Sequence, residues 1–493
     1  LMSEMKKMIK YILCGLQNTN YPVAYGQLDN VMKEYLELVG NEKEIYRVNP
    51  RDFLGPSTIT LQRVNIQNTN EEKEMTLVPN IRTNYSVTEK ADGERRLLYI
   101  SGTGEVYMID TNMTIAYTGV KTTKKNIVHT LLDGELIVHD KYGGYLNLFA
   151  CFDVYFINKQ DRRALPLVHQ QNALDNVSKD SKTDKEKGKA EIGRLQLAER
   201  VINVLRKDIV SQTSRIQFDI SMKQFYYGKN IFTECKKILS KEDDGLFQYE
   251  VDGLIFTPLN ESVPIHKGKF TWNKTMKWKP PEYNTIDFLV SHQNTSSEST
   301  ESHNTTHLRY DDENIMCKYK TLHLRVGYDE KRHGYMNPVR MVLDDKAAAE
   351  THENKNTTEE NKLTGNQSYR PYLFYPSNPY DENAHICNID VTRFNGYDGI
   401  YTERGEVIEN NTIVEFKYDV NASDTKWAWK PIRVRYDKTR ELRNNVRNFG
   451  NDYTVANNNW NTIHYPVTKE IISTGQNIPD IEGNDDVYYN RTQ

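Results

Sequence analysis

Alternating hydrophobic and polar positions run through most of the chain, and they predict strands far more often than helices. The predicted strands are short runs rich in β-branched and aromatic residues, and Gly, Asn, Asp or Pro bounds each run. In the first part of the chain they cover residues 85–90, 95–101, 106–110, 129–138, 146–157, 250–258 and 285–291. In the later part they cover residues 315–328, 370–376, 385–391, 412–419 and 428–436.

Two segments have the spacing of amphipathic helices instead. Residues 194–210 place hydrophobic side chains from Leu195 to Leu205 at intervals of three and four, which is typical of a helix with one buried face. Residues 29–39 have a similar pattern, and Asp29 is a residue type that often caps the start of a helix. We therefore predict helices at both places, the second one beginning at Asp29.

The order of these elements predicts an α+β protein with two domains. A larger mixed domain ends near residue 285, and the five or so strands after it suit a small β-barrel such as an OB-fold. Three polar segments interrupt the pattern, and none can bury enough apolar surface to offset its ordering entropy. We interpret these segments as surface insertions, at residues 174–191, 291–307 and 345–368.

Composition narrows the classes of function further. The chain has 493 residues and a formal net charge of −4, from 64 basic and 68 acidic residues, which argues against a protein that coats nucleic acid by charge alone. No apolar run approaches the ~18–20 residues of a membrane-spanning helix, which argues against an integral membrane protein. The five cysteines form no CxxC pair or metal-spaced cluster, which argues against a disulfide scaffold and a zinc module. We expect a nuclear or cytoplasmic protein that is not secreted.

The most specific chemical pattern is the segment from Glu89 to Arg95, where one predicted strand meets an Asp-Gly turn and a second strand. A lysine at the end of a strand, here Lys90, is held in a fixed place beside backbone N–H groups. Lysine is a nucleophile only when it is neutral, and nearby cations favour the neutral form. Taken alone, the pattern fits a nucleophilic lysine and an ordinary hairpin with a surface lysine about equally well.

Acidic residues inside three later hydrophobic strands change this balance. They are Asp133 and Glu135 in the first strand, Asp153 in the second and Asp252 in the third. A carboxylate in a buried strand is costly unless it is paired or binds a metal. We therefore expect these carboxylates to converge on one pocket.

Two groups of cations follow the carboxylates along the chain. Lys277 and Lys279 alternate onto one side of a strand, where together they suit a phosphate. Arg433 and Arg435 do the same further on, with Lys438 close by. Arginine forks match the oxygens of phosphate, so we interpret the second group as a cationic clamp on a separate domain. Each feature alone fits a charged strand edge, whereas all of them in this order indicate one site.

In this order the motifs KxDGxR, DGE, the FD strand, DGLIF, KWK and RxRxDK resemble those of the covalent nucleotidyltransferases. This superfamily comprises capping guanylyltransferases, ATP-dependent DNA ligases and RNA ligases, and the resemblance runs from about Asp52 to Lys438. The runs FLGPS, DGLIFTP and TMKWKPPEYNTIDFLV are closer to the capping enzymes. The resemblance implies a nucleotidyltransferase domain of the ATP-grasp-like ligase and capping type, followed by a β-barrel OB-fold.

Segments near both ends resemble parts of the multifunctional capping enzymes of large DNA viruses. Only 55 residues (493 − 438) follow Lys438, whereas a doubly wound methyltransferase domain needs well over ~100 residues. Because the chain begins with Leu1, we expect it to be a fragment of a longer protein. The expected regions are a linker or triphosphatase remnant, the nucleotidyltransferase domain, the OB-fold domain with polar insertions and a segment leading toward an absent methyltransferase, at residues 1–50, 51–285, 286–440 and 441–493.

The resemblance also implies a reaction in two steps. Lys90 would attack the α-phosphorus of GTP and form a lysyl-GMP intermediate, and the 5′-diphosphate end of an RNA would then take the GMP to make the GpppN cap. Mg²⁺ or Mn²⁺ would assist, with Asp252 as the first carboxylate near the metal and Glu135 nearer the ribose or a second metal.

The remaining contacts implied by the resemblance come from both domains. Arg95 would contact the ribose or the bound phosphate, and Phe152 would face guanine opposite Ile255. The cationic clamp would reach the β- and γ-phosphates when the small domain closes. The full nucleotide-binding set implied in this way is Asp92, Gly93, Arg95, Glu135, Phe152, Asp252, Lys277, Lys279, Arg433, Arg435, Asp437 and Lys438.

Two other interpretations stay open. An ATP-dependent RNA or DNA ligase would use the same chemistry through a lysyl-AMP intermediate, and a decayed transferase would serve only to bind RNA or a polymerase. The intact lysine, arginine and carboxylate motifs argue against decay. The partners expected of a capping enzyme are GTP, the 5′-diphosphate end of nascent RNA, and RNA polymerase or other capping subunits. The expected location is the host nucleus or cytoplasm, or a virion, with no membrane.

Overall fold

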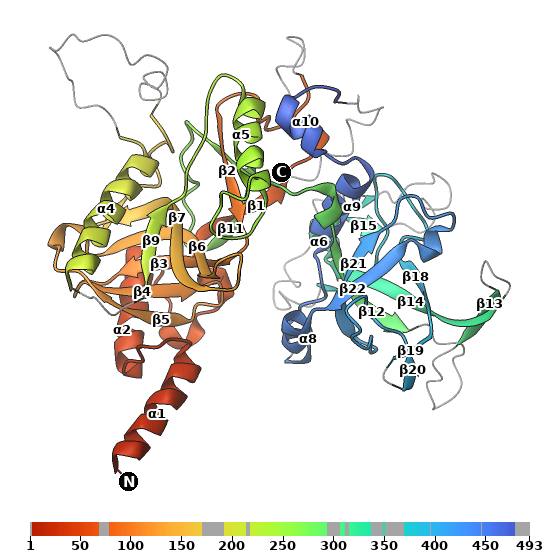
Figure 1. Cartoon of the computed structure of the whole chain (residues 1–493), viewed down its shortest axis with the longest axis horizontal. Helices are drawn as coiled ribbons and strands as arrows, with labels where there is room; N and C mark the ends of the chain where they lie inside the picture. The colour runs from red at the N-terminus through yellow and green to blue at the C-terminus, as the bar shows by residue number, and fades with distance from the viewer. Residues whose placement is uncertain are drawn as a thin grey trace, which may run out of the picture. The chain divides into compact units, whose positions relative to one another are not determined.

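The computed structural model describes residues 2–68, 78–169, 192–212, 217–292, 306–310, 315–336, 349–350, 369–394, 396–444 and 446–478. The predicted surface insertions therefore lie wholly or largely outside the described residues. The described residues fall into two units, which we consider separately (Figure 1). Unit 1 contains those up to Lys279 together with Lys469–Ile478, and unit 2 contains those from Pro280 to Thr468.

Two sheets form the framework of unit 1. The smaller sheet has the strand order β1 (Gly55–Thr60), β11 (Lys269–Trp278), β10 (Val251–Pro258) and β2 (Tyr85–Ala91). The larger sheet has the order β5 (Ile115–Lys121), β4 (Glu105–Asp110), β3 (Glu94–Ile100), β6 (Thr130–His139), β7 (Tyr145–Ile157) and β8 (Gln160–Asp161), and β9 (Asp219–Met222) pairs with β7. All strands predicted for this part of the chain are present, and the mixed α and β class is confirmed.

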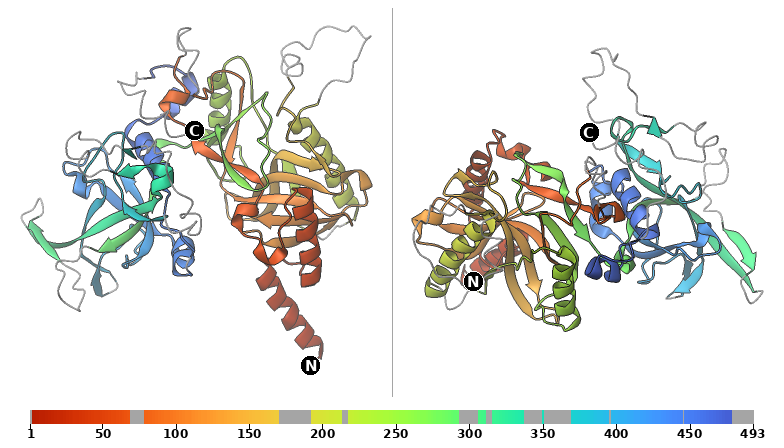
Figure 2. Two further views of the ribbon diagram at one scale, coloured as in Figure 1. Left: turned by 180° about the vertical axis from the view of Figure 1, so that it is seen from behind. Right: turned by 90° about the horizontal axis from the view of Figure 1, so that it is seen from above.

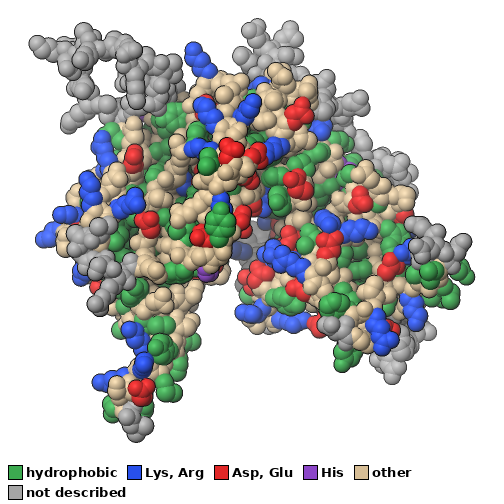
Figure 3. Space-filling view, in the orientation of Figure 1, with side chains coloured by type: hydrophobic (Ala, Val, Ile, Leu, Met, Phe, Trp, Pro, Cys, Tyr) green, Lys and Arg blue, Asp and Glu red, His purple; other side chains and the backbone are tan. Residues whose placement is uncertain are grey.

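Helices cover both faces of the larger sheet. Alternate side chains of β3 point to opposite faces, so Leu97 packs in a core with Tyr35, whereas Leu98 packs in a core with Leu205. Figures 1 and 2 show that helix α1 (Met2–Gln17) extends away from the sheet, and its exposed hydrophobic and lysine side chains are visible in Figure 3. The helices of unit 1 are α1 (Met2–Gln17), α2 (Tyr25–Leu38), α4 (Arg194–Gln212), α5 (Ile231–Asp243) and α10 (Lys469–Thr474).

One helix prediction is confirmed and the start of the other is wrong. The helix predicted at residues 194–210 is α4. The second, α2, begins at Tyr25 after Ala24, so Asp29 lies inside the helix and does not cap it. The hydrophobic pattern becomes regular only after the first turn, which is why the sequence suggested a later start. No helix among the described residues has the length and apolar character needed to cross a membrane.

Asp153 lies opposite Asp133 in the pairing of β6 and β7, and its carboxylate has a partner that the sequence reasoning did not name. It pairs with Arg194, which is completely buried at the start of α4, through contacts of 2.8 and 3.1 Å. The guanidinium also donates to the backbone carbonyl of Leu165 and, at 3.2 Å, to that of Glu261. This ion pair satisfies the buried carboxylate inside the fold, and it fastens α4 to β7.

Replacing Arg194 by methionine is expected to destabilise unit 1 by about 3–5 kcal/mol, because the Asp153 carboxylate would be left buried without its partner. The matched control is Arg206→Met on the same helix, where an exposed arginine lies 3.7 Å from Asp219 and contributes less than about 1 kcal/mol. Urea unfolding followed by circular dichroism measures both changes. Equal shifts of the unfolding midpoint in the two variants would show that the buried ion pair contributes no more to stability than the exposed one.

Unit 2 is built around one larger sheet. Its strand order is β13 (His307–Tyr310), β14 (Met316–Tyr328), β12 (Ile286–His292), β21 (Thr412–Tyr418) and β22 (Trp429–Val434), and β17 (Arg370–Leu373) and β18 (Ile386–Asp390) also pair with β14. Two short pairs join β15 (Tyr335–Met336) to β16 (Ala349–Glu350) and β19 (Thr392–Phe394) to β20 (Tyr397–Gly399). The helices are α6 (Glu330–His333), α8 (Tyr436–Arg443) and α9 (Tyr453–His464). The strands predicted after residue 284 are all present.

Candidate active site

Lys90 lies near the end of β2, where a bulge in β10 brings Asp252 opposite to it. The pairing register of the two strands shifts between Val251 and Leu254, and Asp252 lies within this bulge. Lys90 Nζ donates to Asp252 Oδ1 at 2.5 Å, and Lys279 Nζ lies 2.7 Å from Oδ2. Burial alone would raise the pKa of Asp252, but the two ammonium groups outweigh burial and lower it. Asp252 is therefore an anion that bridges two lysines.

The Asp92–Gly93 turn does not close a hairpin. β2 belongs to the smaller sheet and β3 to the larger, so the chain changes sheets at this turn. The Asp92 N–H donates to the carbonyl of Glu250 at 2.9 Å, which fixes one side of the turn. On the other side, a Cβ atom at Gly93 would lie 2.7 Å from Glu135 Cγ and 2.9 Å from the carbonyl oxygen of Leu136. Glycine alone allows this approach, which holds the preceding lysine at the junction of the sheets.

Arg95 is held by a buried carboxylate on the next strand. Its Nε and Nη2 donate to the two oxygens of Asp133 at 3.1 and 2.5 Å, and its Nη1 donates to the carbonyl of Pro56 at 2.5 Å. Asp133 also accepts a hydrogen bond from Tyr155 Oη at 2.5 Å. Burial raises the pKa of Asp133, and the neighbouring Arg95 opposes that rise. The guanidinium lies 5.7 Å from the ring centre of Phe152, so the two face the same space.

Glu135 lies on β6 beside these groups and is partly buried. Burial raises its pKa, while the charges of Lys223, Lys90 and Arg95 act in the opposite direction. Glu135 pairs in register with Arg95 of β3 and approaches Gly93, so it lies beside the turn that follows Lys90. The prediction that Glu135 is nearer the ribose stays a prediction.

A buried ion pair next to Lys90 was missed by the sequence reasoning. Lys223 Nζ donates to the backbone carbonyl of Glu89 at 2.5 Å and lies 3.5 Å from Glu89 Oε1, and both side chains are almost fully buried. Tyr249 Oη donates to the same carboxylate at 2.9 Å. Lys223 follows the short strand β9 in a segment with no distinctive motif, so no sequence signal pointed to it. The pair fixes the backbone on which Lys90 stands.

The remaining residues predicted in unit 1 lie on the strands around this site. Lys277 is part of β11 and pairs in register with Ile255 of β10, and both are partly buried. Lys279 follows the end of β11. The proposed placement of guanine between Phe152 and Ile255 is a prediction that the contacts leave open.

The later group of cations lies together on unit 2. Asp287 of β12 and Glu415 of β21 are partners across neighbouring strands. Arg435 Nη1 and Lys438 Nζ lie 2.6 and 2.5 Å from Asp287 Oδ2, and Arg433 Nε lies 2.6 Å from Glu415. Arg435 also pairs with Asp437 at 3.1 Å. Burial would raise the pKa of Asp437, but Arg435 outweighs it and lowers this pKa. The three predicted cations therefore share one surface.

The carboxylates near Lys90 are compatible with a divalent cation bound together with phosphate. The described residues contain no group of three His, Cys, Asp or Glu side chains placed to hold a metal by themselves. Mg²⁺ usually keeps several waters and binds through one or two carboxylates plus substrate phosphates. Asp252 and Glu135 are carboxylates of the type that such a cation takes, and their role as its ligands stays a prediction.

Comparison with known families gives the site its context. A family described as "mRNA capping enzyme, catalytic domain" matches residues 23–281 of this chain, more than half of its length. The chain belongs to this mRNA capping enzyme family. The resemblance inferred from the motifs is thereby confirmed. The matched range contains Lys90, Asp252 and Lys279, whereas the cations of unit 2 lie beyond it.

Named relatives of this chain include proteins of viruses and of an animal. A probable mRNA-capping enzyme of Acanthamoeba polyphaga mimivirus is 26% identical over 494 residues, covering 93% of this chain and 36% of its own length. An mRNA-capping enzyme of African swine fever virus is 24% identical over 402 residues, covering 79% and 35%. The mRNA-capping enzyme of Caenorhabditis elegans is 26% identical over 259 residues, covering 50% and 35%. The chain thus spans little more than a third of the length of these relatives.

Proposed function

We propose that this chain is an mRNA guanylyltransferase that forms a covalent lysyl-GMP intermediate from GTP and transfers GMP to the 5′-diphosphate end of RNA. The observation that carries the proposal is the row Lys90–Asp252–Lys279, in which one carboxylate bridges two lysines at 2.5 and 2.7 Å. The row lies within the range matched by the capping family. One lysine is then available as nucleophile and the other as a phosphate contact.

In the first step, the neutral amine of Lys90 attacks the α-phosphorus of GTP. A P–N bond forms, the P–O bond to pyrophosphate breaks, and the proton of the amine passes to solvent. The low pKa of Asp252 makes it a weak proton acceptor, so we assign it to holding the amine in position. Lys279, together with Lys277, stabilises the negative charge that develops on the α-phosphate oxygens.

In the second step, a terminal oxygen of the RNA 5′-diphosphate attacks the same phosphorus. The P–N bond breaks, GMP passes to the RNA, and Lys90 recovers its proton from solvent. Lys277 and Lys279 of the KWK motif again stabilise the negative charge on the α-phosphate oxygens, so one set of cations serves both steps. Phe152 and Ile255 would hold guanine, and Arg95 with Asp92 would bind near the ribose or phosphate.

Asp252 and Glu135 would hold Mg²⁺ or Mn²⁺ together with the phosphates of the nucleotide. When bound, such a cation neutralises charge on the phosphate oxygens and favours the neutral form of a nearby lysine. Removal of divalent cations with a chelator is then expected to stop formation of the intermediate.

Unit 2 would serve as an OB-fold-type domain that carries a clamp for the outer phosphates. Arg433, Arg435 and Lys438 are gathered within one surface and are paired with carboxylates. The oxygens of a triphosphate are alternative partners for the same cations. The clamp would contact the β- and γ-phosphates and orient pyrophosphate as the leaving group. The partners expected of this function are GTP, nascent RNA and RNA polymerase or other capping subunits, in the nucleus, cytoplasm or virion.

Incubation with α-labelled GTP or α-labelled ATP, in separate reactions with a divalent cation, tests the proposal. We expect the protein to become labelled by GTP and to take at least about tenfold less label from ATP, which corresponds to about 1.4 kcal/mol of discrimination. Label from ATP alone would assign the chain to the ligases. Absence of label from either nucleotide would indicate a non-catalytic protein that only binds RNA or a polymerase.

A further inference from the structure

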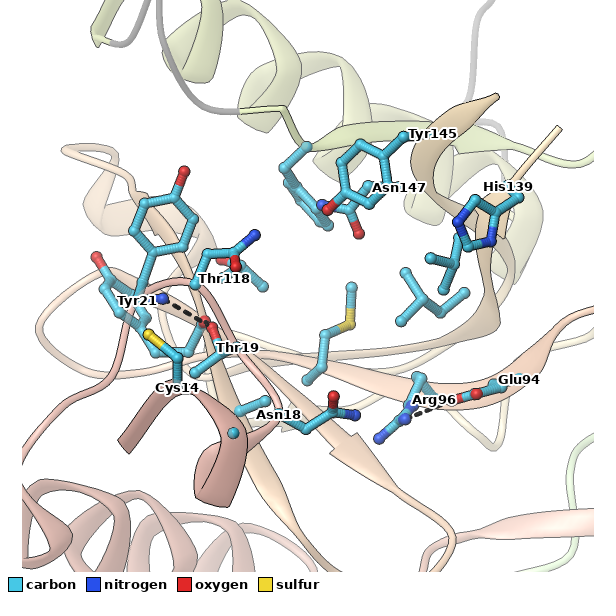
Figure 4. Close-up of a pocket in the computed structure, with 18 residues that line it drawn as sticks. Cys14, Asn18, Thr19, Tyr21, Glu94, Arg96, Thr118, His139, Tyr145 and Asn147 are labelled. Carbon is cyan, nitrogen blue, oxygen red and sulfur yellow. Dashed lines mark hydrogen bonds and ion pairs between the residues drawn. The ribbon is translucent and has the colours of Figure 1, made fainter. Parts of the chain in front are cut away.

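A cavity of about 690 Å³ in unit 1 is lined by side chains from several strands of the larger sheet (Figure 4). Side chains alternate along β3, so Arg95 faces Asp133 while Glu94 and Arg96 line the cavity. Met108 of β4, along with hydrophobic residues of β5 and β6, forms its apolar floor. The cavity is therefore separate from the site around Lys90.

One wall is the loop between α1 and α2, which lies against the edge strand β5 and is fixed in place. Thr19 Oγ1 donates to the carbonyl of Tyr117 on β5 at 2.5 Å. The side chain of Gln17 donates to the carbonyl of Val23 at 2.8 Å and accepts from its N–H at 3.0 Å. Tyr21 lies so close to β5 that a Cβ at Gly119 would be 2.6 Å from its ring. The cavity is thus formed before any ligand binds.

The polar side chains that line the cavity include those of Arg96 and Asn147. Arg96 has a side chain only 10% exposed, and its Nε has no hydrogen-bond partner within the part of the chain that the structure describes. Its other nitrogens pair with Glu94 at 2.5 Å and lie 3.4 Å from Asp110. The Nε atom is itself enclosed by the protein, so a ligand in the cavity would meet other parts of the lining. Asn147, labelled in Figure 4, adds an amide to the same lining.

Aromatic rings stand around these polar groups. Tyr21, Tyr145 and His139 line the cavity, and the rings of His139 and Tyr145 lie 6.2 Å apart, edge to face. No lysine is among the lining residues, and the terminal nitrogens of Arg96 are engaged by carboxylates. A phosphate group would find little compensating charge here. A flat, uncharged heterocycle matches the rings and the asparagine side chains that line the cavity.

We propose that this cavity is a second binding site, which takes an unpaired nucleobase. Stacking on a tyrosine suits every base, and amide side chains pair with base edges. The phosphates of a bound nucleotide or RNA strand would stay in solvent. A nucleobase reaches the cavity either as a free nucleoside or as part of single-stranded RNA, and both sources share this chemistry. The proposal rests on the cavity alone and does not require the transferase reaction.

Calorimetric titration of the full chain tests the site. The probes are uridine, cytidine and adenosine, and tetramers of each with a 5′-hydroxyl end; guanine is omitted because GTP is the proposed substrate. Tyr145→Ala is expected to weaken binding at least about fivefold, since stacking on an aromatic residue contributes about 1–3 kcal/mol per base. The matched control is Tyr142→Ala in the same turn, where the tyrosine is 86% exposed and outside the cavity lining.

A second variant, Ala116→Phe, fills the floor of the cavity and is expected to abolish binding while thermal melting confirms that it folds. Equal binding of nucleosides and tetramers would support a free nucleoside as the ligand, and tighter binding of tetramers would support RNA. The proposal is overturned if the wild type binds neither probe, or if Tyr145→Ala and Ala116→Phe bind like the wild type. Labelling by GTP is measured in parallel, so loss of that label rejects the transferase and leaves the cavity result unaffected.

Discussion

Lys90→Ala is expected to lower covalent labelling by GTP at least about a thousandfold, because the alanine has no amine to form the P–N bond. Lys90→Arg should be equally inactive, since arginine keeps the positive charge toward Asp252 but does not become a neutral nucleophile. The rate of adduct formation is measured with α-labelled GTP after denaturing electrophoresis. These two variants together separate the loss of the nucleophile from the loss of a charge.

The matched control for this prediction is Lys237→Ala on α5. Lys237 is an exposed lysine that pairs with Glu234 at 2.8 Å, and it is absent from the proposed site. Its replacement should leave the labelling rate within about twofold of the wild type. Persistent labelling of Lys90→Ala would mean that another residue forms the adduct.

The second large effect is expected from Arg435→Ala and Lys438→Ala, which should affect the two half-reactions unequally. Both residues are assigned to the β- and γ-phosphates, which leave as pyrophosphate in the first step. Formation of the lysyl-GMP intermediate should therefore fall about 10²–10³-fold, as observed when one stabilising donor is removed from a transition state. Transfer of GMP from preformed intermediate to RNA should change less than about threefold, because pyrophosphate has already gone.

The two rates are measured by single-turnover labelling and by chase of isolated intermediate with diphosphate-ended RNA. Lys417→Ala is the control, because Lys417 lies on the neighbouring strand and pairs with Glu403 at an exposed position. Thermal melting is recorded as well, since both clamp residues also hold Asp287. Equal loss in both half-reactions, with unchanged melting, would refute the clamp role.

The strands and the chemical motifs were predictable because their signals are local. β-branched and aromatic runs between turn residues predicted the sheets, and the KxDGxR spacing singled out Lys90. The order of later motifs added Asp252 and Lys279. In the structure, Asp252 lies 2.5 Å from Lys90 and 2.7 Å from Lys279. Buried strand carboxylates need partners, and this general cost is what pointed to Asp252 from sequence alone.

The partners of the buried charges were not predictable, because they come from distant parts of the chain. Asp153 finds Arg194 and Glu89 finds Lys223, and neither pairing leaves a trace in local spacing. The sheet to which a strand belongs also depends on distant partners. The Asp-Gly turn therefore suggested a hairpin, although the chain changes sheets there. The early start of α2 was missed because its first turn carries no regular hydrophobic pattern.

Mapping of the adduct tests the central claim most directly. The protein is incubated with GTP and a divalent cation, digested, and its peptides are analysed by mass spectrometry under conditions that preserve the phosphoramidate bond. We predict that guanylate is attached to the peptide that contains Lys90, on the side-chain nitrogen of that residue. Guanylate on Lys223 or Lys279, or on no lysine of unit 1, would contradict the assignment of Lys90 as the nucleophile.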